Sequence, residues 1–259
     1  MSFDLPVRFS HLVAYGRSGA DGYLARTKEA DQTTAMQRGT AVHALVFGTR
    51  KVMAWTLTKN RSGKEYDAFV AANPDVEILT VIEYNKANRM ADAVRASKVA
   101  APYLQGKVEE TIFFDWYGKK CRATPDVRGD GHVTELKTAA TSDPSRFVWH
   151  ALRRHYNAQL RMQQIACGDD GSDAYIVCVE STGAFNVTVF HLEPRALEFG
   201  EKNLCLWMER LKTCEASDRY PPYVECVVPL DAPDDIELDF GDDASDGADS
   251  MQEKYGLQP

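Results

Sequence analysis

Several features that would identify common classes of protein are missing from this sequence. No apolar run approaches the roughly 20 residues that a membrane-spanning helix needs, and no internal repeat is visible. The first residues, MSFDLPVRFSHL, lack the basic-then-apolar pattern of a secretory signal peptide. We therefore expect a protein that stays in the cytoplasm and has no membrane partner.

Closely spaced cysteines are also missing. The six cysteines lie at positions 121, 167, 178, 205, 214 and 226, and the two nearest are nine residues apart. Because there is no C-x-x-C pair, zinc sites built on such pairs are excluded. We expect reduced and largely buried thiols, as in cytoplasmic proteins.

The net charge of the whole chain is not the positive charge that is typical of a nucleic-acid-binding protein. Its 259 residues carry a formal net charge of −8. However, ten acids lie in residues 231–253, which contain no lysine or arginine, so the remainder carries a charge of +2. We predict a single domain over residues 1–230 and a disordered acidic tail over residues 231–259. The tail is a solubilising segment, a docking segment or a mimic of DNA.

The most informative segment that is present is PDVRGDGHVTELKTA, residues 125–139. Residues 118–127 and 132–138 read as two strands, and the Gly-Asp-Gly between them predicts a tight hairpin turn. Side chains alternate along a strand, so Glu135 and Lys137 share one face while Leu136 points into the core. Asp126 can lie across from Glu135 on the first strand.

These charged residues have the chemistry to cut a phosphodiester bond. Mg²⁺ prefers oxygen ligands, and a bound cation lowers the pKa of a water and stabilises charge on phosphoryl oxygens. A lysine such as Lys137 can orient that water or neutralise the developing charge. The D-x₈-E-x-K pattern also occurs by chance, but a charged pair on a half-buried strand needs a reason.

Residues 144–167 are predicted to form one helix, and this helix carries a second cluster of polar residues. Pro144 suits its first turn, and Ser142 or Asp143 suits its cap. Three polar residues at spacings of three and four share a face: Tyr156, Gln159 and Gln163. Four arginines could bind phosphates: Arg146, Arg153, Arg154 and Arg161. An ordinary amphipathic helix with a solvated basic face has the same pattern.

Upstream, residues 36–48 predict a helix that begins near Gly39 or Thr40 and carries His43 close to its start. A histidine beside apolar residues is more often packed than a ligand, and imidazole suits Mn²⁺ better than Mg²⁺.

The rest of the chain alternates between predicted helices and short strands. We expect a helical N-terminal region over residues 1–35, helices over 64–73, 83–101 and 194–216, and strands over 76–82, 108–116, 174–181 and 184–191. This order predicts an α/β fold with a central mixed sheet flanked by helices.

These segments, in this order, resemble the PD-(D/E)XK nuclease superfamily. Pro125-Asp126 and Glu135-Leu136-Lys137 match its name-giving motif. More narrowly, residues 36–223 are similar to the RecE (exonuclease VIII) type of phage recombination exonuclease. The motifs that carry this similarity are G-x-x-x-H at Gly39–His43, N-x-x-G-K at Asn60–Lys64, E-x-x-[I/V] at Glu109–Ile112 and Y-x-x-Q at Tyr156–Gln159.

The resemblance implies a restriction-endonuclease-like αβββαβ core and a role for each matching residue. The implied metal ligands are the side chains of His43, Asp126 and Glu135, with the Leu136 carbonyl as a further one, for Mg²⁺ or for Mn²⁺ in its place. Lys137 would assist the attacking water, and Tyr156 and Gln159 would hold the DNA strand near the scissile bond. The sequence leaves open whether Glu109 or Glu110 faces the site.

The resemblance also implies an activity. Enzymes of this group digest linear duplex DNA from the 5′ end as rings of three or four subunits, and they pass the 3′ strand to a single-strand annealing protein. Relatives with a cysteine-ligated iron–sulfur cluster have closely spaced cysteines, which this chain lacks. If the protein is phage-encoded, it would act in the cytoplasm of a bacterial host.

Two alternatives remain open. One is a nuclease of the same superfamily with another substrate, either an endonuclease or a single-strand exonuclease. The other is a non-catalytic DNA-binding or partner-binding module, against which the presence of Asp126, Glu135 and Lys137 argues.

Overall fold

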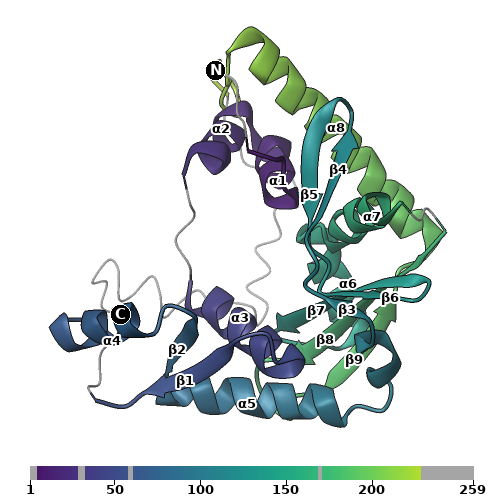
Figure 1. Ribbon diagram of the computed structural model, residues 1–259. Helices are drawn as coiled ribbons and strands as arrows, with labels where there is room; N and C mark the ends of the chain where they lie inside the picture. Colours follow the sequence, from purple (N-terminus) through teal and green to yellow (C-terminus); the bar gives the residue numbers. More distant parts are fainter. Residues whose placement is uncertain (1–4, 29–32, 58–60, 169–170, 229–259) are drawn as a thin grey trace, which may run out of the picture. The chain divides into compact units, whose positions relative to one another are not determined.

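The computed structural model describes residues 5–28, 33–57, 61–168 and 171–228. The chain divides into two units, residues 1–223 and 224–259, and the first unit contains all the elements described below (Figure 1). The predicted acidic tail and Asn60 of the predicted N-x-x-G-K element lie outside the described residues.

The helices are α1 (Phe9–Arg17), α2 (Gly19–Thr27), α3 (Thr34–Phe47), α4 (Lys64–Ala72), α5 (Val81–Ala96), the 3₁₀ helix η1 (Ala101–Leu104), α6 (Pro144–Arg153), α7 (Tyr156–Cys167) and α8 (Pro194–Ser217). The strands are β1 (Lys51–Trp55), β2 (Val76–Thr80), β3 (Lys107–Val108), β4 (Ile112–Trp116), β5 (Lys119–Ala123), β6 (Val127–Gly129), β7 (His132–Ala139), β8 (Asp173–Glu180) and β9 (Val187–His191).

Five strands form a mixed sheet in the order β3-β6-β7-β8-β9. Strands β6 and β7 make the predicted hairpin, with Gly129 opposite His132 and Gly131 in the turn at a φ of 70°, where glycine has no steric cost. Strand β8 lies parallel to β7 after the α6–α7 crossover, and β9 returns antiparallel. The prediction of a central mixed sheet flanked by helices is confirmed.

The two faces of this sheet are covered by different helices, because alternate residues of each strand point to opposite faces. Leu136 is fully buried and packs with Val177 against residues of α3 and α5. Val133 and Ile176 point the other way and pack against residues of α6 and α7. A third core joins α1, α7 and α8 with the β4–β5 hairpin. Strand β7 is therefore fixed from both sides.

Two predicted strands are each split in the structure. The expected strand 108–116 consists of β3, which pairs with β6, and β4, which pairs with β5 in a separate sheet. The break falls at Glu109, whose φ is 49°. The expected strand 118–127 is interrupted between β5 and β6 around Pro125, which has no N–H to donate to a ladder.

Three helix predictions were wrong in their limits. The expected helix 144–167 breaks into α6 and α7, because His155 has a left-handed φ of 57°. Helix α3 begins at Thr34, where the Thr33 side chain accepts a hydrogen bond from the Met36 N–H, so His43 does not lie close to the helix start. Helix α5 spans 81–96 rather than 83–101, and strand β1 was not predicted.

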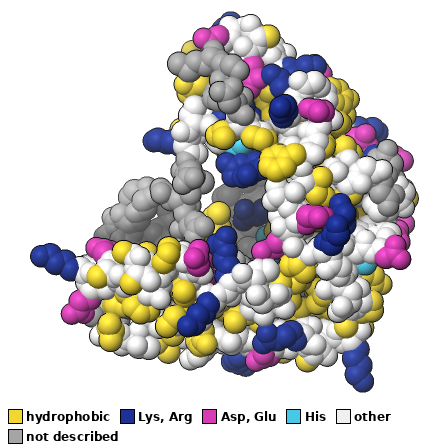
Figure 2. Space-filling view, in the orientation of Figure 1, with side chains coloured by type: hydrophobic (Ala, Val, Ile, Leu, Met, Phe, Trp, Pro, Cys, Tyr) yellow, Lys and Arg dark blue, Asp and Glu magenta, His cyan; other side chains and the backbone are white. Residues whose placement is uncertain are grey.

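Other expectations concern the cysteines and the membrane. The structure contains six free cysteines, of which Cys121, Cys178 and Cys214 are buried. Among the described residues, no helix is both long and apolar enough to span a membrane. Lysine and arginine side chains are interspersed with acidic ones on the face that Figure 2 displays.

Candidate active site

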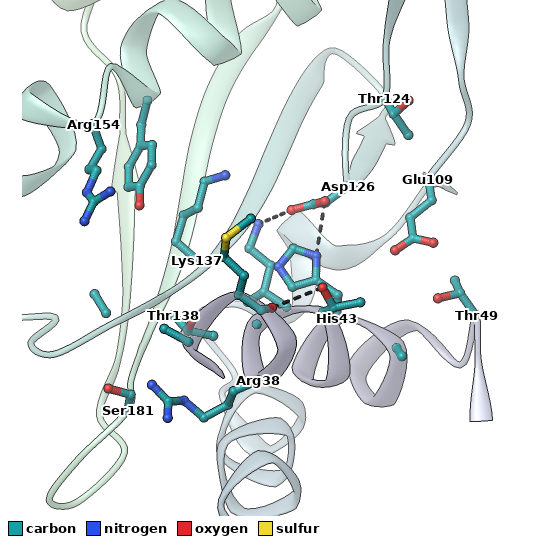
Figure 3. Close-up of a pocket in the computed structure, with 18 of the residues that line it drawn as sticks. Arg38, His43, Thr49, Glu109, Thr124, Asp126, Lys137, Thr138, Arg154 and Ser181 are labelled. Carbon is teal, nitrogen blue, oxygen red and sulfur yellow. Dashed lines mark hydrogen bonds and ion pairs between the residues drawn. The ribbon is translucent and has the colours of Figure 1, made fainter. Parts of the chain in front are cut away.

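Many of the predicted site residues surround one cavity of about 870 Å³ (Figure 3), whereas Glu135, Arg153, Gln159 and Gln163 do not line it. Helix α3 lies on one side of it, β7 and the loop before β6 form its base, and the α6–α7 junction closes another side. The lining includes most of the expected residues: His43, Glu109, Asp126, Leu136, Lys137, Arg154 and Tyr156.

Asp126 is held by two contacts. Its Oδ1 lies 3.2 Å from Nδ1 of His43, and its Oδ2 accepts a 2.7 Å hydrogen bond from the backbone N–H of Leu136 (Figure 3). Asp126 directly precedes β6, in which Val127 lies opposite Thr134. Continuing this register by one residue places Asp126 next to Glu135, as the hairpin prediction requires.

Glu135 is 2% exposed, and all its contacts come from Lys137 and α7. Its Oε2 accepts hydrogen bonds from Lys137 Nζ at 2.5 Å and from Gln159 Nε2 at 2.8 Å. Its Oε1 accepts one from Gln163 Nε2 at 2.5 Å. Lys137 Nζ also donates to Gln159 Oε1 at 3.0 Å and lies 4.8 Å from the centre of the Tyr156 ring. The predicted helical face thus meets the predicted strand face.

The electrostatics of this cluster are those of a buried charge network. Burial disfavours the charged form of Lys137, but Glu135 and Asp126 outweigh this and raise the pKa of the ammonium. Burial and then the charge of Asp126 raise the pKa of Glu135, against the opposing effect of Lys137. The ammonium is therefore protonated at neutral pH and compensates one of the two carboxylates.

The second carboxylate depends on His43. Burial would raise the pKa of Asp126, but His43 and then Lys137 lower it below the ordinary value. Burial would lower the pKa of His43, and the charge of Asp126 overcomes this and raises it. The charged forms of His43 and Asp126 therefore stabilise each other.

The chemical types of these side chains suit a divalent cation. Carboxylate and carbonyl oxygens suit Mg²⁺, and the imidazole of His43 suits Mn²⁺. Among the described residues, however, no group of three or more His, Cys, Asp or Glu side chains is close enough to hold an ion. The oxygens of Glu135 are engaged by α7 and by Lys137, whereas His43 and Asp126 line the cavity.

The structure distinguishes the two acids that the sequence could not. Glu109 lines the cavity together with Asp126 (Figure 3), and its N–H donates to the Asp126 carbonyl at 3.1 Å. Glu110 instead forms ion pairs with Lys107 at 3.2 Å and with Arg128 at 3.4 Å. The positive φ of Glu109 separates the directions of these two side chains.

The arginines divide in the same way. Arg154 lines the cavity, whereas Arg146 and Arg153 are exposed outside it. Arg161 is paired with Glu201 at 2.9 Å. Sequence reasoning missed Arg38 and Arg50, which also line the cavity. Arg38 directly precedes the Gly39 of the G-x-x-x-H motif. Its position next to this motif could have identified it as a candidate site residue.

A protein family described as "PDDEXK-like domain of unknown function (DUF3799)" matches residues 9–228. The chain belongs to this PDDEXK-like family. The predicted resemblance to the PD-(D/E)XK nucleases is thereby confirmed. The family assignment supports a nuclease, and PDDEXK nucleases generally use divalent metals.

A solved structure shares the fold of this chain, whereas no curated protein matches this chain. A candidate exonuclease from Eubacterium rectale is 14% identical with a TM-score of 0.60, and the match covers 91% of this chain and 93% of that one. A phage related exonuclease from Haemophilus somnus 129PT is 12% identical, with coverages of 83% and 97%. Its TM-score of 0.38 is too low to carry an argument.

Proposed function

We propose that this protein is a metal-dependent exonuclease that digests linear duplex DNA from the 5′ end and leaves 3′ tails for recombination by strand annealing. The observation that carries the proposal is the meeting, in one cavity, of the His43–Asp126 pair with Lys137, which is itself held by Glu135 and Gln159. Arg154 and Arg50 line the same cavity, where a DNA phosphate could be bound bidentately.

The cation would be held by Asp126, His43 and the Leu136 carbonyl, with Glu135 or Glu109 as further ligand. When bound, Mg²⁺ or Mn²⁺ would supply Lewis acidity toward the phosphoryl oxygens and lower the pKa of a water. Asp126 is already oriented for this role by the Leu136 N–H.

Lys137 acts on the attacking water and on the charge that develops in the transition state. Its ammonium is kept protonated by Glu135 and Asp126, and it is fixed between Glu135 and Gln159. A positioned cation of this kind requires little reorganisation during the reaction. The Tyr156 ring packs beside it, and Tyr156 would hold the strand next to the scissile bond.

The test is digestion of linear duplex DNA labelled at the 5′ or the 3′ end, with Mg²⁺ and with a chelator. We expect early release of the 5′ label with Mg²⁺ and none with the chelator. Closed circular duplex should stay intact, and its cleavage would indicate an endonuclease. Faster digestion of single strands would indicate a single-strand exonuclease. If none of these substrates is digested, the remaining interpretation is that the protein is a non-catalytic binding module.

We also propose that the enzyme works as a ring of three or four subunits in the cytoplasm, together with a single-strand annealing protein. Support for this comes from the resemblance of the motifs alone. Light scattering in solution would measure the subunit number, and a monomer would contradict the ring.

A further inference from the structure

A second and smaller cavity, of about 270 Å³, adjoins the first. Thr124 lines both cavities. The second cavity lies between the start of α1, the end of β5 and α7, and its polar lining consists of Arg8, Ser10, Arg122, Thr124, Gln159 and Gln163. No acidic residue is among the described residues that line it.

The backbone places the two arginines of this cavity side by side. The Val7 N–H donates to the Lys120 carbonyl, and the Arg122 N–H donates to the Val7 carbonyl, both at 2.8 Å. Val7 therefore lies opposite Cys121 as in a parallel ladder, and both of these residues are buried. Because side chains alternate, Arg8 and Arg122 point together to the other face.

Like charges in such neighbouring positions repel each other. Neither Arg8 nor Arg122 forms an ion pair with an acid in the part of the chain that the structure describes. An anion between the two guanidinium groups would convert this repulsion into attraction.

The first turn of α1 adds to the positive potential. Arg8 is the residue before α1, so the positive end of the helix dipole lies beside its side chain. The Arg8 Nε donates to Nε2 of buried His11 at 3.2 Å. Burial first, and then the charges of Arg8, Arg26 and Arg122, lower the pKa of His11 to about 4.

Gln163 supplies a second and independent indication of a ligand. It is 3% exposed and its Nε2 donates to Glu135, but its Oε1 has no hydrogen-bond partner among the described residues. A buried acceptor without a partner is costly. A ligand that carries both an anionic group and a hydroxyl would satisfy the arginines and Gln163 together.

We propose that this second cavity binds the terminal phosphate of the DNA strand that is digested, with Arg8 and Arg122 on the phosphate and Gln163 on a hydroxyl of the terminal nucleotide. A volume of about 270 Å³ suits a phosphate and part of a sugar, since pockets for whole drug-sized ligands begin at roughly 300 Å³. The inference rests on the proposed function. Gln159 and Gln163 contact both this cavity and Glu135, so a bound end would lie beside the catalytic carboxylate.

The first test measures binding without catalysis. The full chain, in chelator, is titrated by calorimetry with inorganic phosphate, a nucleoside 5′-monophosphate and the nucleoside alone. We expect the monophosphate to bind more tightly than inorganic phosphate and the nucleoside to bind undetectably. Arg122→Gln should weaken binding of the monophosphate at least about tenfold, the loss of one charge-assisted hydrogen bond.

Arg17→Gln is the matched control, because Arg17 lies at the other end of α1 and pairs with Asp21 at 3.2 Å. Unchanged affinity in Arg122→Gln, an equal loss in Arg17→Gln, or no binding by the wild type would overturn the proposal. Arg8→Gln repeats the test if Arg122→Gln fails to fold. The His11 resonance gives a second readout, because bound phosphate should raise its pKa.

The second test uses linear duplex DNA with 5′-phosphate or 5′-hydroxyl ends. The wild type should digest the phosphorylated DNA faster, and Arg122→Gln should lose this preference while Arg17→Gln keeps it. Equal wild-type rates on both ends would contradict a terminal-phosphate site. If no DNA is digested, the proposed function fails, whereas the calorimetry still decides whether the cavity binds phosphate.

Discussion

Glu109 and Glu110 are adjacent in the sequence, yet only Glu109 lines the cavity that contains Asp126. We predict that Glu109→Gln lowers the Mg²⁺-dependent rate about tenfold or more, within the range for weakened support of a metal site. Glu110→Gln should change little, because half-exposed ion pairs contribute at most about 1 kcal/mol. Rates measured across a Mg²⁺ titration compare the two variants, and equal effects would refute the assignment.

Lys137 and Glu135 form a buried ion pair. A substitution that tests one of them must therefore keep the shape of its side chain. Glu135→Gln keeps the shape of the side chain, and we expect it to lower digestion at least about 100-fold, as for loss of a catalytic group. Lys137→Met should do the same. Circular dichroism must show a retained fold, and a near-wild-type rate in both variants would exclude this cluster as the catalytic site.

At the level of single residues, the sequence predicted that Glu135 and Lys137 share a strand face and that Tyr156, Gln159 and Gln163 share a helix face, because periods of two and 3.6 residues define faces of strands and helices. It could not predict that the oxygens of Glu135 turn toward α7. Nor could it place Glu109, because the direction of this side chain depends on a positive φ. No sequence pattern predicts a positive φ for a glutamate.

Helices α7 and α8 are in close contact at Gly200. A Cβ added there would lie 2.8 Å from the backbone of Ala158, whereas one added at Gly39 would meet only Thr138 Oγ1 at 3.6 Å. We predict that Gly200→Ala destabilises the protein by about 1–3 kcal/mol through overpacking. Gly39→Ala, the control, should be neutral or stabilising by up to about 1 kcal/mol, because alanine favours helices.

Urea unfolding would measure both glycine variants. Gly200→Ala should also lower activity, because α7 carries Gln159 and Gln163. If both variants unfold at the same urea concentration as the wild type, then α7 is not fixed by its contact with α8.

Most elements of the nuclease core were predictable, because their apolar periodicity and turn residues agree. The failures occur where tertiary contacts override the local pattern. His155 takes a left-handed φ and breaks the predicted helix, and its ring packs 4.9 Å from that of Trp207 on α8. Strand β1 was missed because its parallel partner β2 lies more than 20 residues further along the chain.

On the scale of the whole molecule, charge is unevenly distributed along the chain. The acids of residues 231–253 account for the net negative charge, while Arg8, Arg122 and Arg154 line the two cavities. The net negative charge therefore does not contradict the proposed DNA binding, because the local field at a cleft determines how an anionic substrate is attracted.

Burial of His11, together with the charges of Arg8, Arg26 and Arg122, makes the stability of the protein depend on pH. The pKa of His11 falls from 6.5 in the unfolded chain to about 4 in the folded protein, so the folded state favours the neutral ring. The resulting stability is fully present above pH 6.5 and is lost as the pH falls toward about 4. The loss at the acid end is at most about 3 kcal/mol.

We therefore predict that the free energy of unfolding falls more steeply between pH 7 and pH 4.5 in the wild type than in His11→Gln. The Gln side chain stays neutral and can still accept a hydrogen bond from Arg8. Other groups titrate equally in both proteins, so the difference between the two curves isolates His11. Urea unfolding in phosphate-free buffer measures it, because phosphate in the second cavity would raise the His11 pKa and flatten the curve. Parallel curves for the two proteins would mean that neither burial nor the charges of Arg8 and Arg122 lower the pKa of His11.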